Sequence, residues 1–277
     1  MDRKTALRDF LVFHRSRLSP GDVGLPVHGR RRVAGLRREE VAALASVSVD
    51  QYIRLERGRT SLVSDAVLDA VAGVLRLTAG ERRYLRALAR RPAPAAAPAR
   101  VRDSQQRILD SLRESPAYLV GRNGAILAWN RPAARVFFDF PRIPPQDRSL
   151  GRLMFTHPRA RSLFLGWEGT AREIVAYLRT ETVRRPYDPE LAAHVGGLLA
   201  GSADFRRLWT AQFPFDATRE PSRLACPELG TTLRLSWEAF EPADAGDAWM
   251  VVYTAAEGSP SADALRTLAD RPAVPAG

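Results

Sequence analysis

The sequence predicts two domains, an all-helical domain of five helices followed by an α+β domain. Apolar residues recur at helical spacing through the first third of the chain, Pro alternates with Ala over residues 91–100, and strand-like segments occur only after that stretch. A length of 277 residues suffices for two modest cores. We therefore expect domains at 1–91 and 104–269, a linker at 92–103, and a disordered tail at 270–277.

The first domain shows only helical patterns. Its apolar spacing predicts five short helices, at about 4–18, 37–45, 49–57, 64–75 and 79–90.

The second domain mixes helices and strands. After a helix at 104–113, two strands at 117–120 and 125–129 flank a turn at 122–124 and form a hairpin. The remaining pattern predicts four helices and then two more strands, at 131–138, 159–183, 188–200, 202–212, 231–240 and 248–255.

Positive charge is concentrated in the first domain. Residues 1–91 hold 19 Lys and Arg against 10 Asp and Glu, a net charge of +9, whereas the rest of the chain carries +2. Arginine is used throughout, since Lys4 is the only lysine, but that bias does not explain the asymmetry. A local positive field suits a polyanion, because each phosphate neutralised by arginine releases condensed counterions.

Several classes of protein are disfavoured by the sequence. No run approaches the roughly 18 apolar residues of a membrane span, and the N-terminus lacks a signal-peptide core, so we expect a cytoplasmic, nucleoid-associated protein without a membrane partner. The single cysteine, Cys226, excludes an internal disulfide, and the four histidines lack metal-ligand spacing. Because no catalytic motif occurs, we expect no enzyme, no catalytic residues, no cofactor and no metal.

Residues 36–58 carry the strongest signal, which is a helix, a tight turn and a second helix. The expected contact face combines positions from both helices: Val41, Leu44, Ala45, Tyr52 and Leu55. Ser48 is placed to cap the second helix, with its hydroxyl near the amide of Gln51, and Gly58 is a natural stop. This pattern is typical of a DNA-binding helix-turn-helix, and the alternative is a helical protein-interaction domain with a solvated charged face.

A second helix lying in the major groove would present its outward side chains to the bases. Gln51 can pair with adenine and Arg54 with guanine, Val49 or Ile53 can contact a thymine methyl group, and Asp50 can accept from cytosine. Arg38, Arg57 and Arg59 are better placed to bind phosphates than to read bases. The predicted DNA-binding residues are therefore Arg38, Ser48, Val49, Asp50, Gln51, Ile53, Arg54, Arg57 and Arg59.

Residues 5–90 resemble the Cro/repressor-type helix-turn-helix family, in which the second helix ends in Leu-Glu-x-Gly, here 55–58. The chain departs from that family at Ser46, where glycine is preferred, and at Arg37, where a Ser or Thr cap is usual. It resembles the MmyB-like regulators more specifically, through a long insertion at 18–32 and the following residues 35–45. In that insertion, 30–32 (Arg-Arg-Arg) could extend the contact to DNA or form a solvated loop.

The resemblance to MmyB-like regulators continues over residues 104–268. It is carried by matching stretches at 118–120, 127–131, 204–209, 251–255 and 258–261. It implies a PAS-like domain that binds a fatty-acid-like or other amphipathic small molecule and alters DNA binding. Cys226 precedes Pro227 where the family often has His, which argues against catalysis at that position.

Aromatic residues are dense in the second domain, and they can line an apolar pocket around a polar anchor or form plain core. The candidate ligand-binding residues are Tyr118, Trp129, Asn130, Phe137, Phe155, Trp209, Trp237 and Tyr253. Asn130 precedes Arg131 and Pro132, so its first interpretation is a helix N-cap.

The expected partners are double-stranded DNA, a small amphipathic ligand and a second copy of the chain. A homodimer is expected because one short helix reads few base pairs, and two-fold pairing doubles the site. The alternative to a ligand sensor is a DNA-binding protein whose C-terminal domain is a protein-interaction module.

Overall fold

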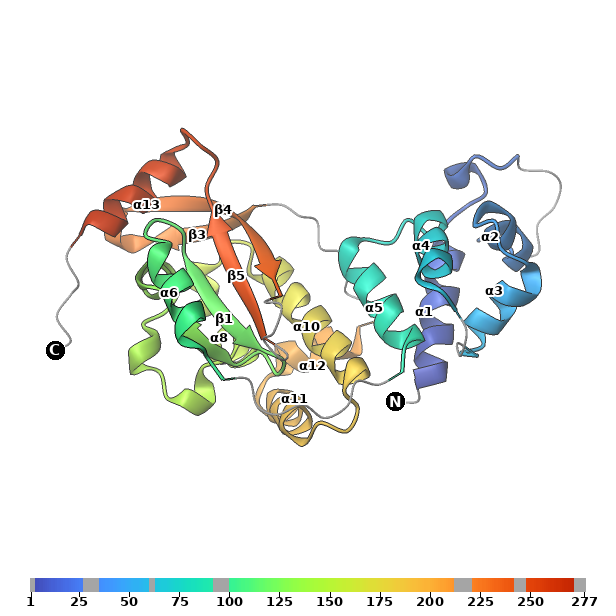
Figure 1. The fold of residues 1–277 in the computed structure, drawn as a ribbon, viewed down its shortest axis with the longest axis horizontal. Helices are drawn as coiled ribbons and strands as arrows, with labels where there is room; N and C mark the ends of the chain where they lie inside the picture. Colours follow the sequence, from blue (N-terminus) through green and yellow to red (C-terminus); the bar gives the residue numbers. More distant parts are fainter. Residues whose placement is uncertain are drawn as a thin grey trace. The chain divides into compact units, whose positions relative to one another are not determined.

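The structure is a computed structural model and describes residues 3–26, 35–59, 63–91, 100–211, 221–241 and 248–271. It divides into two compact units, one of Met1–Pro94 with Arg179–Asp188 and one of Ala95–Leu178 with Pro189–Gly277 (Figure 1). The expected arginine loop at 30–32, most of the expected linker, and the expected tail from 272 lie outside the described residues.

The N-terminal unit is helical, as the sequence predicts. Its described α-helices are α1 (Arg3–Arg17), α2 (Arg38–Leu44), α3 (Val49–Glu56), α4 (Asp65–Val74) and α5 (Ala79–Ala89). Three of them begin at a hydroxyl cap, because Ser48, Ser64 and Thr78 each accept a hydrogen bond from the backbone amide three residues later. The predicted and observed helix boundaries agree here because each cap depends only on residues that are close together in the sequence.

Large side chains from several helices fill the core of this unit. Phe10 of α1 packs edge to face on Tyr84 of α5, with ring centroids 5.4 Å apart. Tyr52 and Leu55 of α3 are buried as well. Gly58 follows α3 at φ +72°, and a Cβ there would come within 2.8 Å of the Lys4 Cα. A glycine is required at this position by both its conformation and its close approach to α1.

Leu44 was expected on the contact face of the helix pair but lies at the surface. Val41 is fully buried, and Ala45 is buried too, but Leu44 is 37% exposed. Leu44 is the last residue of α2, so the tight turn that follows leaves it at the surface.

The C-terminal unit is built on one five-stranded antiparallel sheet in the order β2-β1-β5-β4-β3. Its strands are β1 (Ala117–Gly121), β2 (Ile126–Trp129), β3 (Ser222–Cys226), β4 (Thr231–Phe240) and β5 (Ala248–Thr254). The predicted hairpin and the two later strands are confirmed. β3 was not predicted, because five residues between two prolines, with only Leu224 and Cys226 buried, give little periodicity.

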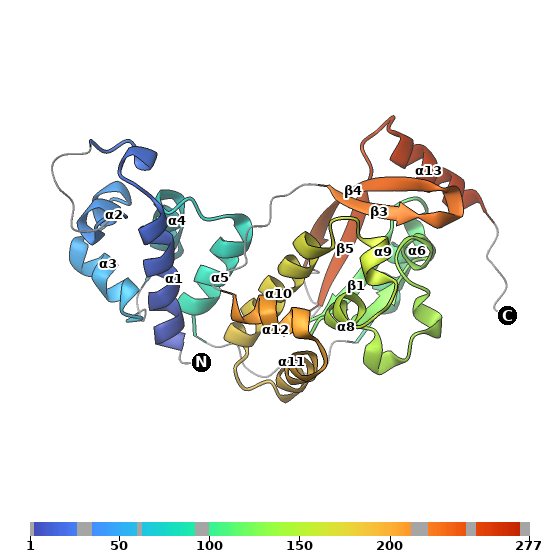
Figure 2. The same cartoon turned by 180° about the vertical axis from the view of Figure 1, so that it is seen from behind.

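The sheet has two differently covered faces (Figures 1 and 2). The inner face, with Val120, Leu233 and Val251, belongs to the main core together with most of the helices. Those helices are α7 (Arg131–Val136), α8 (Leu150–Phe155), α9 (Ala160–Leu163), α10 (Trp167–Arg184), α11 (Pro189–Gly201), α12 (Ala203–Thr210) and α13 (Pro260–Asp270).

The outer face is covered in part by one helix. Leu119 of β1 and Met250 of β5 form a small second core with Leu109 of α6 (Asp103–Ser111). α6 is the first element of this unit along the chain. It covers β1, β2 and β5 on the side of the sheet opposite the main core.

The single helix expected at 159–183 is wrong. The helix is interrupted between α9 and α10. There Phe164 forms an isolated β-bridge with Leu224, and the Leu165 amide donates to the Arg223 carbonyl at 2.9 Å. Pairing with β3 satisfies these backbone groups, so the helix is interrupted although the apolar spacing continues through it. α8 and α13 were not predicted, even though Ser259 before Pro260 marks the start of α13.

Candidate functional site

α2 and α3 form a helix-turn-helix whose turn is stabilised by local hydrogen bonds. The Ser46 amide donates to Ala43 O and the Val47 amide to Ala42 O, the paired bonds of a Schellman motif. Ser46 adopts φ +54°, the left-handed conformation that glycine takes most easily. Ser48 then caps α3 by accepting from the Gln51 amide at 3.1 Å, so the predicted N-cap is confirmed.

α3 presents a polar face opposite its buried residues. Tyr52 and Leu55 point into the core, whereas Val49, Asp50 and Arg54 are exposed. The structure brings all the predicted base-reading positions of α3 onto this outer side, since Gln51 and Ile53 remain partly accessible at its edges: Val49, Asp50, Gln51, Ile53 and Arg54.

The positive rim of this face comes from arginines at its end. Arg57 and Arg59, both exposed, follow α3 directly. Their exposure is compatible with the predicted phosphate contacts, which stay a prediction.

Arg38 has a structural role that the sequence did not reveal. Its guanidinium donates from Nε and Nη2 to Glu56 Oε1 at 2.9 and 2.7 Å, although the side chain is 46% exposed. Hydrogen bonding and charge from Glu56 raise the pKa of Arg38. Arg38 therefore stabilises the unit, and a contact with phosphate stays a prediction that involves only its exposed part.

Glu56 is the residue that sequence reasoning missed in this unit. Its carboxylate is almost fully buried and also bonds Arg15 of α1, Nε to Oε2 at 3.3 Å, while Arg15 donates from Nη1 to Leu36 O at 2.6 Å. Burial and this carboxylate together raise the pKa of Tyr52. The sequence does contain a signal for this role, because Glu56 follows Tyr52 by four residues and therefore shares its inner side of α3.

In the C-terminal unit, three of the candidate ligand-binding residues meet on the inner face of the sheet. Tyr118, Phe137 and Tyr253 are buried, with ring centroids 4.7–6.0 Å apart. The hydroxyls of Tyr118 and Tyr253 lie 3.2 Å apart and share a hydrogen bond. Burial raises the pKa of Tyr118 to about 12 and raises that of Tyr253 well above its ordinary value, so both stay protonated.

Other aromatic candidates belong to the same core but contact other rings. Phe155 and Trp209 both contact Phe205, with ring centroids at 5.0 and 5.3 Å. Trp129 packs on Phe140 at 5.1 Å, and the Arg148 guanidinium lies 5.2 Å from the Trp129 ring centroid. The structure thus does not gather all eight candidates into one site.

Trp237 and Asn130 differ from the buried tyrosine pair. Trp237 is in register with Tyr253 but is exposed. The prediction that Asn130 binds a ligand is corrected by its hydrogen bonds, because backbone groups use its whole side-chain amide. Its Oδ1 accepts from the amides of Ala117 and Ala133, and its Nδ2 donates to the carbonyls of Leu112 and Ser115, at 2.8–3.0 Å. Asn130 caps α7 and ties it to β1, which leaves no amide group for a ligand.

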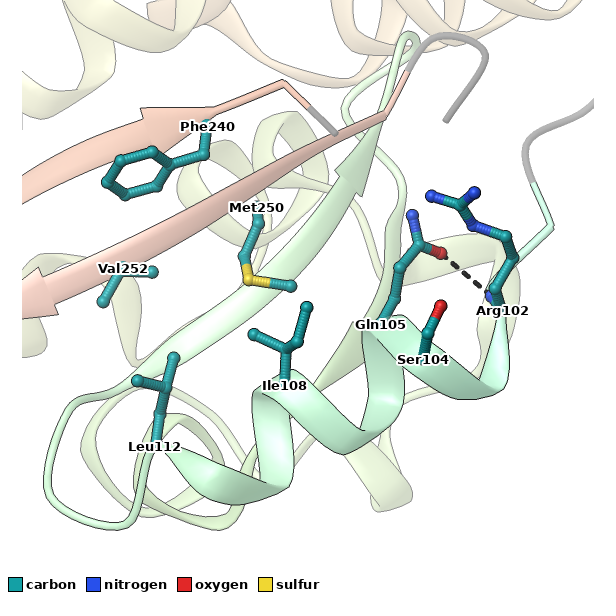
Figure 3. A pocket seen from close by; sticks show the side chains of 8 residues that line it. All are labelled: Arg102, Ser104, Gln105, Ile108, Leu112, Phe240, Met250 and Val252. Carbon is teal, nitrogen blue, oxygen red and sulfur yellow. Dashed lines mark hydrogen bonds between the residues drawn. The ribbon is translucent and has the colours of Figure 1, made fainter. Parts of the chain in front are cut away.

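A groove on the outer face of the sheet was not foreseen. It has a volume of about 490 Å³ and lies between α6, the middle of β5 and the end of β4. Figure 3 shows Ile108 of α6 and Leu112, which follows α6, pointing toward Met250 and Val252 of β5, with Phe240 beyond them and Arg102 near one end. The sequence signal for this groove is the apolar Ile108, which lies beside the buried Leu109 face of α6.

Within the described ranges, no cluster of three or more His, Cys, Asp and Glu side chains could hold a metal ion. No helix among the described residues is both long and apolar enough to cross a membrane.

Comparison with protein families defines first the class and then the family. The model of a helix-turn-helix domain matches residues 22–85, which contain α2 and α3, so the N-terminal unit is a helix-turn-helix DNA-binding domain. The model of the MmyB-like transcription regulator ligand binding domain matches residues 101–268, more than half of the chain. The chain belongs to this MmyB-like family and is a DNA-binding transcription regulator with a ligand-binding domain. A search of curated proteins found no match.

Proposed function

We propose that the protein is a one-component regulator that reads a specific duplex sequence with α3 and changes its DNA binding when its C-terminal domain takes up a small amphipathic, fatty-acid-like ligand. The outer face of α3 is the observation that carries the DNA-binding half. Val49, Asp50 and Arg54 are exposed on a helix that the Ser48 cap and the Glu56 ion pairs hold rigidly.

The tyrosine pair supports the ligand half. Tyr118 and Tyr253 place two hydroxyls inside an aromatic layer of the main core, within the influence of the Glu173 carboxylate, and such a layer suits a ligand with a long apolar chain and one polar end. A ligand head group would replace the hydroxyl-hydroxyl bond with its own. Linkage then requires that DNA change ligand affinity by the same factor that ligand changes DNA affinity.

Selection of genome fragments by the purified protein at near-physiological salt tests DNA reading. We expect a short motif to be enriched by the wild type and lost with Arg54→Ala. Retention of fragments without any preferred sequence would leave only electrostatic binding and contradict the proposal.

Native mass spectrometry followed by titration tests the ligand. We expect long-chain fatty acids to bind more tightly than their methyl esters, and Tyr253→Phe to weaken binding about tenfold, the effect of losing one hydrogen bond to the head group. Tyr177→Phe is the matched control, because that hydroxyl donates to the Gly121 carbonyl at 2.9 Å, outside the pair. Equal losses in both variants would remove the tyrosine pair from the ligand site.

The outer groove favours a second candidate function for this domain, in which it binds a protein. An apolar groove on a sheet face suits a macromolecular surface as well as a small molecule. If the purified domain carries no lipid and binds none of the acids, the protein-interaction function is supported instead.

A further inference from the structure

We infer that Asp50 of α3 reads a cytosine through its N4 amino group, so that N4-methylation of that one base blocks binding of the protein to its DNA site. The inference rests on the proposed function, because it needs α3 in the major groove. It goes further by naming one base contact and a chemical mark on DNA that controls it.

Asp50 is an acid on the outer face of α3. Of the two acids in this helix, Glu56 is buried and paired with Arg15 and Arg38, whereas Asp50, the second residue, is exposed. The Asp50 side chain makes no hydrogen bond or ion pair with any residue that the structure describes. Its carboxylate is therefore available to a group outside the chain.

A carboxylate on a DNA-binding face opposes binding to every sequence, because it repels phosphate. Arg57 and Arg59, which are exposed directly after α3, favour every sequence alike if they bind phosphate. An acid beside these arginines adds nothing to general affinity. Its contribution to binding is to select between bases.

The hydrogen-bonding chemistry of a carboxylate selects cytosine. In the major groove, guanine presents two acceptors, thymine presents an acceptor and a methyl group, and cytosine presents the N4 amino donor. A carboxylate only accepts hydrogen bonds, so it pairs with cytosine and is repelled by guanine and thymine. Adenine suits it less well, because the N6 donor of adenine lies beside the N7 acceptor.

Arg54 indicates where this cytosine lies. Arg54 follows Asp50 by four residues and is exposed on the same side of α3, and the two side chains form no ion pair with each other. Residues at this spacing are about 6 Å apart along a helix axis, and successive base pairs are about 3.4 Å apart. The guanine that Arg54 reads should therefore lie within about two base pairs of the cytosine that Asp50 reads.

Methylation at two positions of the base separates this contact from others. One N4 hydrogen of cytosine lies in the base pair, and the other faces the major groove. A methyl group on N4 replaces the outer hydrogen, which removes the donor for Asp50 and sets an apolar group against a carboxylate. A methyl group on C5 leaves that hydrogen in place, and the exposed Val49 can contact it as it would a thymine methyl group.

Selection from a duplex library of random sequence by the full chain tests the base contact. We expect the wild type to enrich a motif with one cytosine within about two base pairs of the guanine that Arg54→Ala no longer selects. Asp50→Ala should lose the preference for that cytosine and keep the rest of the motif. Asp50→Asn should shift the preference toward adenine, with which an amide pairs twice, and a folding defect cannot produce such a shift.

Fluorescence anisotropy with synthetic duplexes of the motif tests the effect of the mark. The duplexes carry cytosine, N4-methylcytosine or 5-methylcytosine at this position. For the wild type, N4-methylation should weaken binding about 10- to 100-fold, the loss of one hydrogen bond to a charged group, and C5-methylation should change it less than about threefold. Asp50→Ala should bind all the duplexes within about threefold of one another.

Glu39→Ala is the matched control, because Glu39 is likewise an exposed acid at the second position of a helix, here α2. The substitution removes the same charge and the same interaction with a helix N-terminus. It should keep both the preference for the cytosine and the response to N4-methylation.

A motif without this cytosine would overturn the inference, and so would an Asp50→Ala variant that still requires it. Equally tight binding of the unmodified and N4-methylated duplexes by the wild type would overturn it as well. In these cases a motif that is lost with Arg54→Ala leaves the proposed function intact, whereas a wild type that selects no sequence refutes both.

Discussion

Arg38, at the first position of α2, donates twice to the buried carboxylate of Glu56, the last residue of α3, at 2.9 and 2.7 Å. Arg15 of α1 bonds the same carboxylate from the other side. One buried glutamate therefore fixes three helices relative to each other, and it does so directly behind the face of α3 that is proposed to read DNA.

We expect Glu56→Ala to lower the free energy of unfolding of the N-terminal unit by about 3 kcal/mol, because it leaves two arginines without their buried partner. Arg38→Ala should cost about 1–2 kcal/mol, since Arg15 still pairs with Glu56. Urea unfolding followed by far-UV circular dichroism measures this. Tryptophan fluorescence does not, because all five tryptophans lie beyond residue 100.

Arg57→Ala is the control for that series, because Arg57 is exposed one residue after Glu56. It should change stability by less than about 0.5 kcal/mol. If Arg38→Ala is as neutral as Arg57→Ala, the ion pair is a surface contact without energetic value.

Ser46→Gly should stabilise the N-terminal unit by about 1 kcal/mol. Ser46 has φ +54°, a conformation that costs an L-residue roughly 1–2 kcal/mol, and glycine avoids most of that cost. Thermal unfolding by circular dichroism measures the change. Ser48→Ala gives the opposite sign, a loss of about 1 kcal/mol, because it removes the cap of α3. A destabilising Ser46→Gly would mean that the Ser46 side chain makes a contact stronger than the backbone strain.

Base-reading and phosphate-binding roles on the α3 face should separate in binding assays. Gln51→Ala and Arg54→Ala are expected to cost about 1–3 kcal/mol on the selected sequence and little on competitor DNA. Arg57→Ala should weaken both DNAs alike and reduce the salt dependence by about one phosphate contact. Fluorescence anisotropy at several salt concentrations measures both effects. Uniform losses in all three variants would refute the assignment of base readers.

Arg38→Ala should also weaken binding to all DNA roughly uniformly if the exposed part of Arg38 contacts phosphate. That measurement is made at a temperature where the variant is fully folded, so that the lost ion pair to Glu56 is not mistaken for a lost DNA contact.

The C-terminal unit should lose stability in mild acid through His194. Its Nε2 is buried, 3.0 Å from where a Cβ on Gly151 would lie, and burial with the nearby Arg152 charge lowers the pKa of His194 to about 4. The unfolded imidazole has a pKa of about 6.5. The unfolded state therefore binds the extra proton between these values, and stability falls as pH drops from about 6.5 to about 4, by on the order of 2–3 kcal/mol.

Urea unfolding followed by tryptophan fluorescence measures this loss, and His194→Gln should remove it. The comparison with the variant is needed because burial also lowers the pKa of His157. Parallel pH profiles for wild type and variant would show that His194 does not control the acid response.

The sequence by itself determined those features that depend on neighbours along the chain. The five N-terminal helices, the Ser48 cap, the stop at Gly58 and the β1–β2 hairpin follow from caps, turn residues and periodicity that act within a few residues. The outward face of α3 follows as well, because helical spacing fixes which residues lie opposite Tyr52 and Leu55.

Only the tertiary structure decided which side chains meet across the chain. It paired Arg38 with Glu56, used every group of the Asn130 amide, joined the hydroxyls of Tyr118 and Tyr253, and opened a groove between α6 and β4. It also broke the helix at Phe164, whose backbone pairs with β3 some 60 residues away. These contacts depend on packing between distant segments, which local propensity does not encode.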